Sequence, residues 1–179
     1  MADDAPAPAA APPAADKPKL SRGEILAALG GILLGISIFV KTYETRPENP
    51  NAQIDGRGGP NPADGITPGD GTYTIWAVHN ISRILLLLAA IAPFILIYIV
   101  LRQHSLSWPR GEVTMVVGLT AATLLFYTGI VDRPGEPSGQ IELEIGWYGA
   151  FLGAVMIAVG GTMASMQVST RKRKPPGMP

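Results

Sequence analysis

Four long stretches without a charged residue constrain this chain more than any other feature of its sequence. Each stretch holds 16 to 22 consecutive uncharged and mainly apolar residues. At ~1.5 Å per residue, a helix of that length is roughly 24 to 33 Å long, which matches the hydrocarbon core of a bilayer. We therefore expect an all-α membrane protein with four transmembrane helices, at about residues 25–43, 76–101, 113–131 and 145–166.

The segment before the first stretch argues against a cleaved signal peptide. Residues 1–20 include 13 Ala or Pro residues and carry the acidic residues Asp3 and Asp4. A signal peptide instead begins with a basic region and ends at a small-residue cleavage site, which residues 41–46 lack. We expect an uncleaved span after a disordered N-terminal tail, because no apolar face could offset the entropy of ordering residues 1–20.

The distribution of Lys and Arg predicts which ends of the helices face the cytoplasm. Nine basic residues lie in the N-terminal tail, between the second and third spans, and in the C-terminal tail at 169–179. Only four lie in the other two connections. One connection is the outer loop at 44–74 together with the residues just before it, and the other is the loop before the fourth span. The positive-inside rule then places both termini of the membrane domain, residues 21–168, in the cytoplasm of a multi-pass cell membrane protein.

An internal repeat is indicated by two strings that recur in the same order. Residues 20–24 (LSRGE) precede the first span and residues 106–112 (LSWPRGE) precede the third. RPENP at 46–50 follows the first span, and RPGEP at 133–137 follows the third. This order predicts two helix hairpins repeated in parallel around an axis normal to the membrane, closing a four-helix bundle. The alternative is that Arg, Gly, Pro and Glu are simply common at helix ends.

Two of the expected helices carry small residues that would let helix backbones approach closely. Close backbone approach is how helices associate in lipid, where burying apolar side chains brings no gain. The residues concerned are Ala27, Gly31 and Gly35 in the first span and Gly146, Gly149 and Gly153 in the fourth. Packing within the bundle is the favoured explanation, and docking of another subunit is the alternative.

Two further features near the helices have structural interpretations. Pro93 removes one main-chain amide near the middle of the second span, which predicts a helix kink, and Thr120 or Thr123 could donate to the carbonyl of Ala89 that it frees. Residues 21–24 (SRGE) fit the S-x-x-E capping box, in which the serine oxygen and the glutamate carboxylate satisfy amides at a helix start. The carboxylate at position 24 is therefore expected to be structural.

Polar residues gather near one membrane boundary. We expect an outer polar cluster made of His79, Asn80, Arg83, Asp132, Arg133 and Glu144. Salt bridges that fix helix ends are favoured over a metal site, because the second histidine, His104, falls in the cytoplasmic loop. Trp76 and Trp147 are expected at the same boundary, where tryptophan is enriched.

Composition and missing motifs exclude several functions. Lys plus Arg and Asp plus Glu number 14 each, so the net charge gives no sign of a nucleic-acid partner. The chain has no Cys, which removes disulfides, thiolate catalysis and Cys-ligated metals. Neither a zinc-protease motif nor a nucleophile elbow, P-loop or dinucleotide fingerprint is present. We therefore assign no catalytic residue, cofactor or metal.

Three stretches resemble small four-span membrane proteins of high-GC actinobacteria. They are residues 106–113 (LSWPRGEV), 132–139 (DRPGEPSG) and 146–150 (GWYGA). The resemblance implies a bacterial protein with four spans. It carries over no catalytic residue, because that group has no assigned activity.

Three functions follow from these observations. The first is a non-enzymatic structural or accessory subunit that contacts itself or a larger membrane complex through its helix faces. The second is a small transporter or channel component with a polar outer mouth, and the third is a membrane enzyme that uses His79 with an acidic partner. No charged residue lies in the middle of a span, and no catalytic motif is present, so the first function is favoured.

Overall fold

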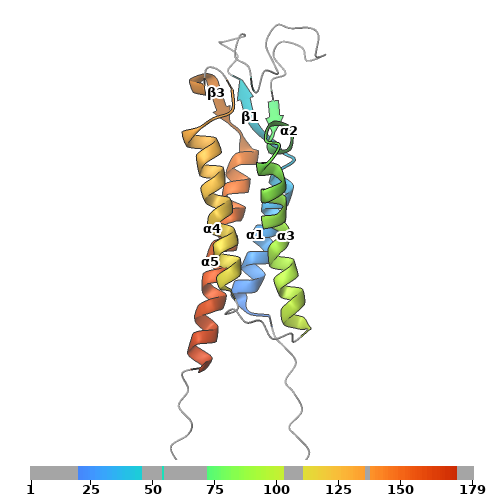
Figure 1. Cartoon of the computed structure of the whole chain (residues 1–179), viewed down its shortest axis with the longest axis vertical. Helices are drawn as coiled ribbons and strands as arrows, with labels where there is room; N and C mark the ends of the chain where they lie inside the picture. The colour runs from blue at the N-terminus through green and yellow to red at the C-terminus, as the bar shows by residue number, and fades with distance from the viewer. Residues whose placement is uncertain (1–19, 46–53, 55–71, 103–110, 136–137, 173–179) are drawn as a thin grey trace, which may run out of the picture.

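The computed structural model describes residues 20–45, 54, 72–102, 111–135 and 138–172, of which 77% are helical. Four longer helices run side by side (Figure 1): α1 (Arg22–Ser37), α3 (Ser82–Leu101), α4 (Glu112–Phe126) and α5 (Ile145–Lys172). The remaining helical elements are α2 (Ile75–Val78), the π-helical turn η2 (Tyr127–Val131) and the 3-10 turn η3 (Ser138–Gln140). The expected tail at 1–20 lies outside the described residues except for Leu20, as do residues 173–179.

Three helical segments are long and apolar enough to cross a membrane. They are Ser82–Leu101, Glu112–Val131 and Ile145–Gln167. These segments coincide with the second, third and fourth expected spans. The helix of the first expected span, α1, is shorter, with 16 residues. Large apolar side chains are exposed on all four helices, among them Leu29, Leu88, Leu119 and Leu152, as suits a lipid environment.

The first expected span is wrong at its C-terminal end, after residue 37. We predicted a helix to residue 43, but α1 ends at Ser37 and Lys41–Thr45 forms strand β1. This part of the chain is rich in β-branched and aromatic residues, which favour a strand where partner strands are available. The expectation of a purely α-helical fold is therefore corrected to a helical bundle with a small sheet.

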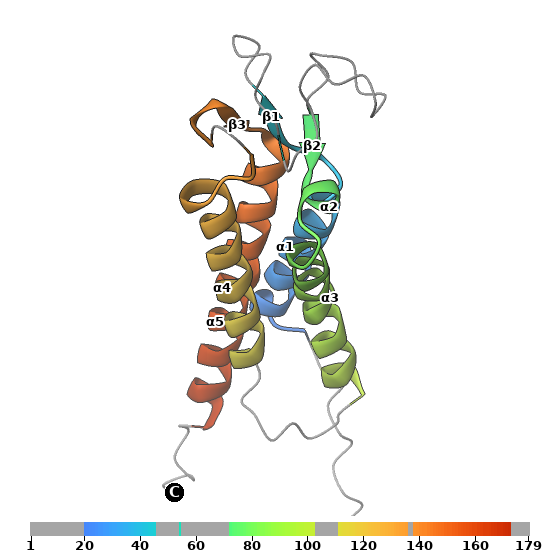
Figure 2. The same cartoon turned by 45° about the horizontal axis from the view of Figure 1, so that its top comes forward.

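The sheet has three antiparallel strands and lies at one end of the bundle, above the helices in Figure 2. Its order is β2-β1-β3, with β2 at Thr72–Thr74 and β3 at Ile141–Leu143. A small apolar cluster packs against the sheet: Tyr43, Ile54, Tyr73, Val78 and Ile141. The expected outer loop at 44–74 thus contains ordered strand residues at both of its ends.

The second expected span is interrupted near its start. We predicted one helix over 76–101, but α2 and α3 are separated at His79, whose main chain is extended, with φ −106° and ψ 101°. α3 then continues through the buried Pro93. The Thr120 hydroxyl donates to the Val116 carbonyl of its own helix, at 2.9 Å, and not to the Ala89 carbonyl as expected.

α5 is the helix around which the bundle is arranged. It packs along α1 on one side and along α4 on the other, whereas α3 packs chiefly against α1. α3 and α4 touch only loosely, and an apolar groove lies between them. The two hairpins therefore do not close the bundle symmetrically, as the predicted repeat would have them do.

Glycines set the close contact between α1 and α5. A Cβ atom at Gly153 would lie 2.6 Å from the main-chain nitrogen of Leu34, and one at Gly30 would lie 2.6 Å from the carbonyl oxygen of Gly153. Ala27, on the same side of α1, is buried. Gly149 faces the Ser37 hydroxyl. These helices therefore touch through their main chains.

The other small residues face different elements. Gly31 is turned toward α3, where a Cβ atom would lie 2.5 Å from the carbonyl oxygen of Ala90. Gly35 is less confined, with the Cβ of Ala90 as the nearest atom, at 3.7 Å. Gly146 packs against the main chain at Val40 and Lys41, where β1 begins. It therefore contacts the sheet and not a neighbouring helix.

The two Arg-Gly-Glu strings occupy matching places in the bundle. Gly23, at the start of α1, lies against Gly160 of α5, and Gly111, at the start of α4, lies against the next residue, Gly161. Gly111 has φ +97°, which glycine adopts without strain. Both glycines contact α5, whereas a two-fold repeat that packs α1 on α5 would pack α4 on α3, so the internal repeat stays a prediction that these contacts do not support.

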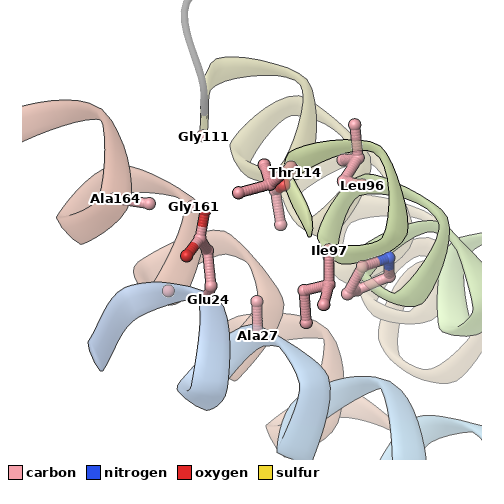
Figure 3. Close-up of a pocket in the computed structure, with 11 residues that line it drawn as sticks. Glu24, Ala27, Leu96, Ile97, Gly111, Thr114, Gly161 and Ala164 are labelled. Carbon is pink, nitrogen blue, oxygen red and sulfur yellow. The ribbon is translucent and has the colours of Figure 1, made fainter. Parts of the chain in front are cut away.

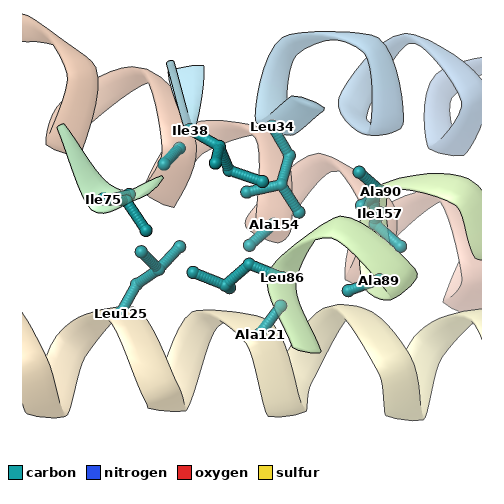
Figure 4. Close-up of a cluster of buried hydrophobic side chains, with 11 residues drawn as sticks. Leu34, Ile38, Ile75, Leu86, Ala89, Ala90, Ala121, Leu125, Ala154 and Ile157 are labelled. Atoms are coloured by element: carbon teal, nitrogen blue, oxygen red, sulfur yellow. The ribbon is translucent and has the colours of Figure 1, made fainter. Parts of the chain in front are cut away.

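The space between the helices near the sheet is filled with apolar side chains. Figure 4 shows these side chains converging from all four longer helices and from α2. They are Leu34, Ile38, Ile75, Leu86, Ala89, Ala90, Ala121, Leu125, Ala150, Ala154 and Ile157.

The glycine contacts predict opposite outcomes for two alanine substitutions. Gly153→Ala should lower the free energy of unfolding by about 1–3 kcal/mol, because its methyl group meets the main chain of α1, which cannot move alone. Gly35→Ala has room, and alanine favours the helix by ~1 kcal/mol, so stability should be equal or higher. Thermal unfolding in detergent measures both. Equal losses in the two variants would contradict the close contact of α1 and α5.

Candidate functional site at the sheet end

The outer end of α4 is a π-helical turn. The Asp132 amide donates to the Tyr127 carbonyl, five residues back, at 2.8 Å, where an α-helix would use Thr128. This shift withdraws the usual amide partner from the Thr128 carbonyl. π-Helical turns of this kind often occur at functional sites, so the candidate site lies at this end of the bundle.

Side chains donate to main-chain carbonyls of this turn and of the last residues of α4 before it. Trp147 Nε1 donates to the Leu125 carbonyl at 3.1 Å, and Arg133 Nε donates to the Gly129 carbonyl at 2.8 Å. The Thr128 hydroxyl donates to the Leu124 carbonyl at 3.0 Å. Buried carbonyls require such donors, because leaving them without a partner costs free energy.

Trp147 is held tightly in this arrangement. Its ring stacks on Phe151 at 5.2 Å between centroids, and only 6% of its surface is exposed. A Cβ atom at Gly129 would overlap the indole ring, so glycine is needed at that position. Its expected place at the membrane boundary stays a prediction, and within the bundle it is buried as a hydrogen-bond donor to α4.

Arg133 joins α4 to the sheet. Besides the Gly129 carbonyl, its guanidinium donates through Nη1 to the Ile141 carbonyl of β3, at 2.8 Å. Asp132, its neighbour, is exposed. Arg133 therefore acts on two main-chain carbonyls, where the sequence predicted salt bridges.

Tyr43 and His79 form a further polar contact beside the π-helical turn. The Tyr43 hydroxyl lies 3.0 Å from His79 Nε2 and 3.5 Å from the Thr128 carbonyl oxygen, and the two rings meet edge to face at 5.7 Å. Tyr43 is fully buried, whereas His79 is half-buried. The contact links β1, the break between α2 and α3, and the outer end of α4.

Within the described part of the chain, Arg83 contacts Trp76 and not a carboxylate as we expected. Its Nη1 donates to the Trp76 carbonyl at 3.1 Å, and its guanidinium carbon lies 5.0 Å from the centre of the Trp76 ring. The Arg83 amide also donates to the His79 carbonyl at 3.2 Å. Arg83 thus fastens α2 to α3, and Asn80, between them, is exposed.

The expected outer polar cluster is therefore divided into separate contacts. His79 faces Tyr43, Arg83 faces Trp76, Arg133 faces main-chain carbonyls, and Glu144 belongs to a fourth group. Among the residues that the structure describes, no group of three or more His, Asp or Glu side chains is placed to hold a metal ion.

Glu144 lies beside Glu44 at the edge of β1. A hydrogen bond with Glu144 raises the pKa of Glu44, and burial and the charges of Glu144 and Glu142 raise it further, while Lys41 opposes them. A carboxyl group with a raised pKa holds its proton longer in the folded chain than in the unfolded chain. Stability from this pair is therefore full at low pH and is lost as the pH rises.

Replacing Glu44 tests this pair. Glu44→Gln should raise the unfolding temperature at pH 7, because it removes the repulsion between two carboxylates, and the gain should fall toward zero as the pH drops through the ordinary glutamate range. Thermal unfolding measured from about pH 4 to pH 8 checks the slope. A gain that does not change with pH would show that the two carboxyl groups are not coupled.

A small pocket lies at the opposite end of the bundle. Its volume is about 20 Å³, enough for one water molecule. The carboxylate of Glu24 points into it, toward α4 and α5 (Figure 3). The capping box is confirmed, since Glu24 Oε2 accepts from the Ser21 amide at 2.7 Å and the Ser21 hydroxyl accepts from the Glu24 amide at 3.1 Å. Glu24 therefore has the structural role predicted for it.

Sequence reasoning missed Tyr43, Thr128 and Trp147 as members of the site. Tyr43 was placed inside a span, and Thr128 was one of several threonines in an apolar run. Trp147 carried a signal, because its indole N–H needs an acceptor when the ring is buried. Nothing in the sequence indicates that Tyr43 reaches that turn.

Comparisons with protein families, with characterised proteins and with solved structures find no match to this chain. The resemblance to actinobacterial four-span proteins stays a prediction.

Proposed function

We propose that this chain is a four-span membrane protein with both termini in the cytoplasm. Three segments have the length and apolarity of spans, and α1 runs beside them with exposed apolar side chains such as Leu29 and Ile36. The start of α1 and the end of α5 lie at the same end of the bundle, opposite the sheet (Figure 1). The excess of Lys and Arg at that end supports a cytoplasmic location for it.

Cysteine labelling tests this topology, because the natural chain contains no Cys. Lys41 and Arg102 are exposed at opposite ends of the bundle. A membrane-impermeant maleimide should label Lys41→Cys in intact cells and Arg102→Cys only after the membrane is opened. The unsubstituted chain is the blank. The reverse pattern would overturn the orientation, and labelling of both sites from outside would overturn the spanning of α3.

The protein's proposed role is that of a non-enzymatic structural or accessory subunit that acts through helix contacts within the membrane. The observation that carries this proposal is the groove between α3 and α4, here called the α3–α4 groove. It measures about 390 Å³. Its lining is apolar apart from one threonine and consists of Leu85, Leu86, Leu88, Ala89, Ala92, Val116, Val117, Thr120, Ala121 and Leu124.

The groove differs from the other helix contacts of the bundle. α1, α4 and α5 meet through glycines at main-chain distance, whereas α3 and α4 leave apolar side chains facing an open space. A second copy of the chain, or a helix of a larger membrane complex, could bury these side chains. Helix packing of that kind is the usual basis of association in lipid.

Two observations make a transport or catalytic role less favourable. Apolar side chains fill the bundle axis near the sheet. The polar side chains there bond to main-chain carbonyls or to one another: Arg83 to Trp76, Arg133 to Gly129 and Ile141, and Tyr43 to His79. A polar mouth or an active site would need such groups turned toward a solute.

Photo-crosslinking from the groove tests the proposed role. A crosslinking amino acid replaces Leu88, which lines the groove and is 58% exposed, or Leu29, which is 52% exposed on α1 away from it. The Leu88 position should give discrete protein adducts in membranes, either of dimer size or with another membrane protein. The Leu29 position is the matched control. Equal adducts from both positions, or none from Leu88, would contradict the role assigned to the groove.

A further inference from the structure

The small pocket opposite the sheet lies where all four longer helices meet. Residues of α1, α3, α4 and α5 form its wall, and it is here called the four-helix pocket. α3 contributes only apolar side chains, among them the buried Pro93 and Val100. Polar side chains enter the wall from the other helices, Glu24 from α1 and Thr114 from α4 (Figure 3).

Glu24 uses one oxygen of its carboxylate in the capping box and leaves the other for the pocket. Oε2 accepts from the Ser21 amide at 2.7 Å, and within the described part of the chain no donor bonds to Oε1. A carboxylate in mainly apolar surroundings needs a hydrogen-bond donor, because burying its charge without one costs free energy. No Lys, Arg or His is among the described residues that line the pocket. The donor must therefore be small enough to enter the pocket.

Thr114 carries a hydroxyl group that its own helix does not use. Thr120, Thr128 and Thr162 each donate to the main-chain carbonyl four residues earlier. Thr114 lies in the first turn of α4, which begins at Glu112, so no carbonyl of the helix precedes it at that distance. The Thr114 side chain is only 7% exposed, and its hydroxyl has no hydrogen bond to any described residue. Buried hydroxyl groups are normally hydrogen-bonded, so a partner inside the pocket is required.

We propose that the four-helix pocket binds one water molecule, which bridges the Glu24 carboxylate and the Thr114 hydroxyl. The pocket volume of about 20 Å³ exceeds the roughly 10–15 Å³ that a bound water needs, and two polar side chains supply the necessary partners. The water donates one proton to Glu24 Oε1, and its oxygen accepts the Thr114 hydroxyl proton.

The glycines of the wall offer a place for the second proton of the water. Gly111, Gly160 and Gly161 have no side chain, so they present main-chain atoms to the pocket. A main-chain carbonyl oxygen has two lone pairs and accepts a second hydrogen bond beside its helical one. Three hydrogen bonds are typical of a buried water.

This water connects two helices that have little direct contact. α1 and α4 both pack along α5 and not along each other, and their starts lie against the consecutive glycines Gly160 and Gly161. A bridge from Glu24 to Thr114 joins these two starts. It also satisfies the polar groups of the pocket, so that α3 covers them with apolar side chains alone.

Magnetisation transfer from water to alanine methyl groups tests for the bound water. Ala27 lines the pocket and is 1% exposed, and Ala154, fully buried in the apolar core, is the matched control. In detergent-solubilised full-length protein with labelled alanine methyl groups, nuclear magnetic resonance should detect transfer from water to Ala27 and not to Ala154. Transfer to Ala27 that is no stronger than transfer to Ala154 would overturn the proposal.

Two substitutions test the part that Thr114 plays. Thr114→Val removes the hydroxyl at nearly constant volume, whereas Thr114→Ser keeps it. Transfer from water to Ala27 should be lost in the valine variant and kept in the serine variant. Undiminished transfer in the valine variant would show that the water does not bind to Thr114.

A double-variant comparison tests the bridge by stability. Glu24→Ala and Thr114→Val each remove one partner of the same water, so their combined loss in unfolding temperature should be smaller than the sum of the two single losses. Ser21→Ala with Thr114→Val is the matched control, because Ser21 belongs to the capping box but does not line the pocket. The losses in the control pair should add. Additive losses in both pairs would contradict the bridge.

Salt composition separates water from a monovalent cation as the occupant. Replacing sodium chloride by choline chloride at equal ionic strength should leave the unfolding temperature of the parent protein unchanged, because water binding does not depend on the cation. A stabilisation that requires sodium and that Thr114→Val abolishes would place an ion between the two oxygens and overturn the proposal.

Discussion

The main-chain contact of α5 with both α1 and α4 is the constraint on which the rest of the bundle depends. Gly160 and Gly161 are consecutive, so they point to different sides of α5, one toward Gly23 and the other toward Gly111. In lipid, moving an apolar side chain from the lipid tails into a helix contact brings no hydrophobic gain. Van der Waals contacts between closely packed helices have to supply the attraction between them. Without side chains at these positions, three helices form one compact unit.

That arrangement explains why α3 is the least constrained of the longer helices. α5 uses its two glycine-bearing sides for α1 and α4, which leaves α3 to pack on the free side of α1, where Gly31 meets the Ala90 carbonyl. Its other side faces α4 across the α3–α4 groove. The groove is therefore a consequence of how α5 distributes its contacts.

The sequence predicted the parts of the fold that depend on local patterns. The uncharged runs gave three membrane-length helices close to their observed positions, and residues 21–24 formed the expected capping box. It did not predict the strand at Lys41–Thr45, because that strand forms with partners about 30 and 100 residues further along the chain. An apolar run alone does not distinguish a helix from a strand that finds such partners.

The sequence indicated several residues that lie at the candidate site, but it did not indicate which groups they contact. His79, Arg83 and Arg133 do lie at the sheet end, yet each bonds to a group whose position depends on main-chain geometry. The π-helical turn decides which carbonyls need donors, and no residue pattern in the third run specifies that turn. Trp147 shows the same limit, because tryptophan is typical of the membrane boundary and the sequence does not indicate that its indole N–H donates to the Leu125 carbonyl of α4.

The sheet end and the groove are connected through α3. The start of α3 is held at the sheet end, where the Arg83 amide bonds to His79 and the Arg83 side chain to Trp76. The rest of α3 contacts α1 but is separated from α4 by the groove. Any change in the width of the groove must therefore move α3 against the α1–α5–α4 unit. Since packed helices shift by small sliding motions, the fixed start of α3 is where such a motion would pivot. His79, which precedes this start of α3, contacts Tyr43 of β1, so the sheet helps to hold the start of α3 in place.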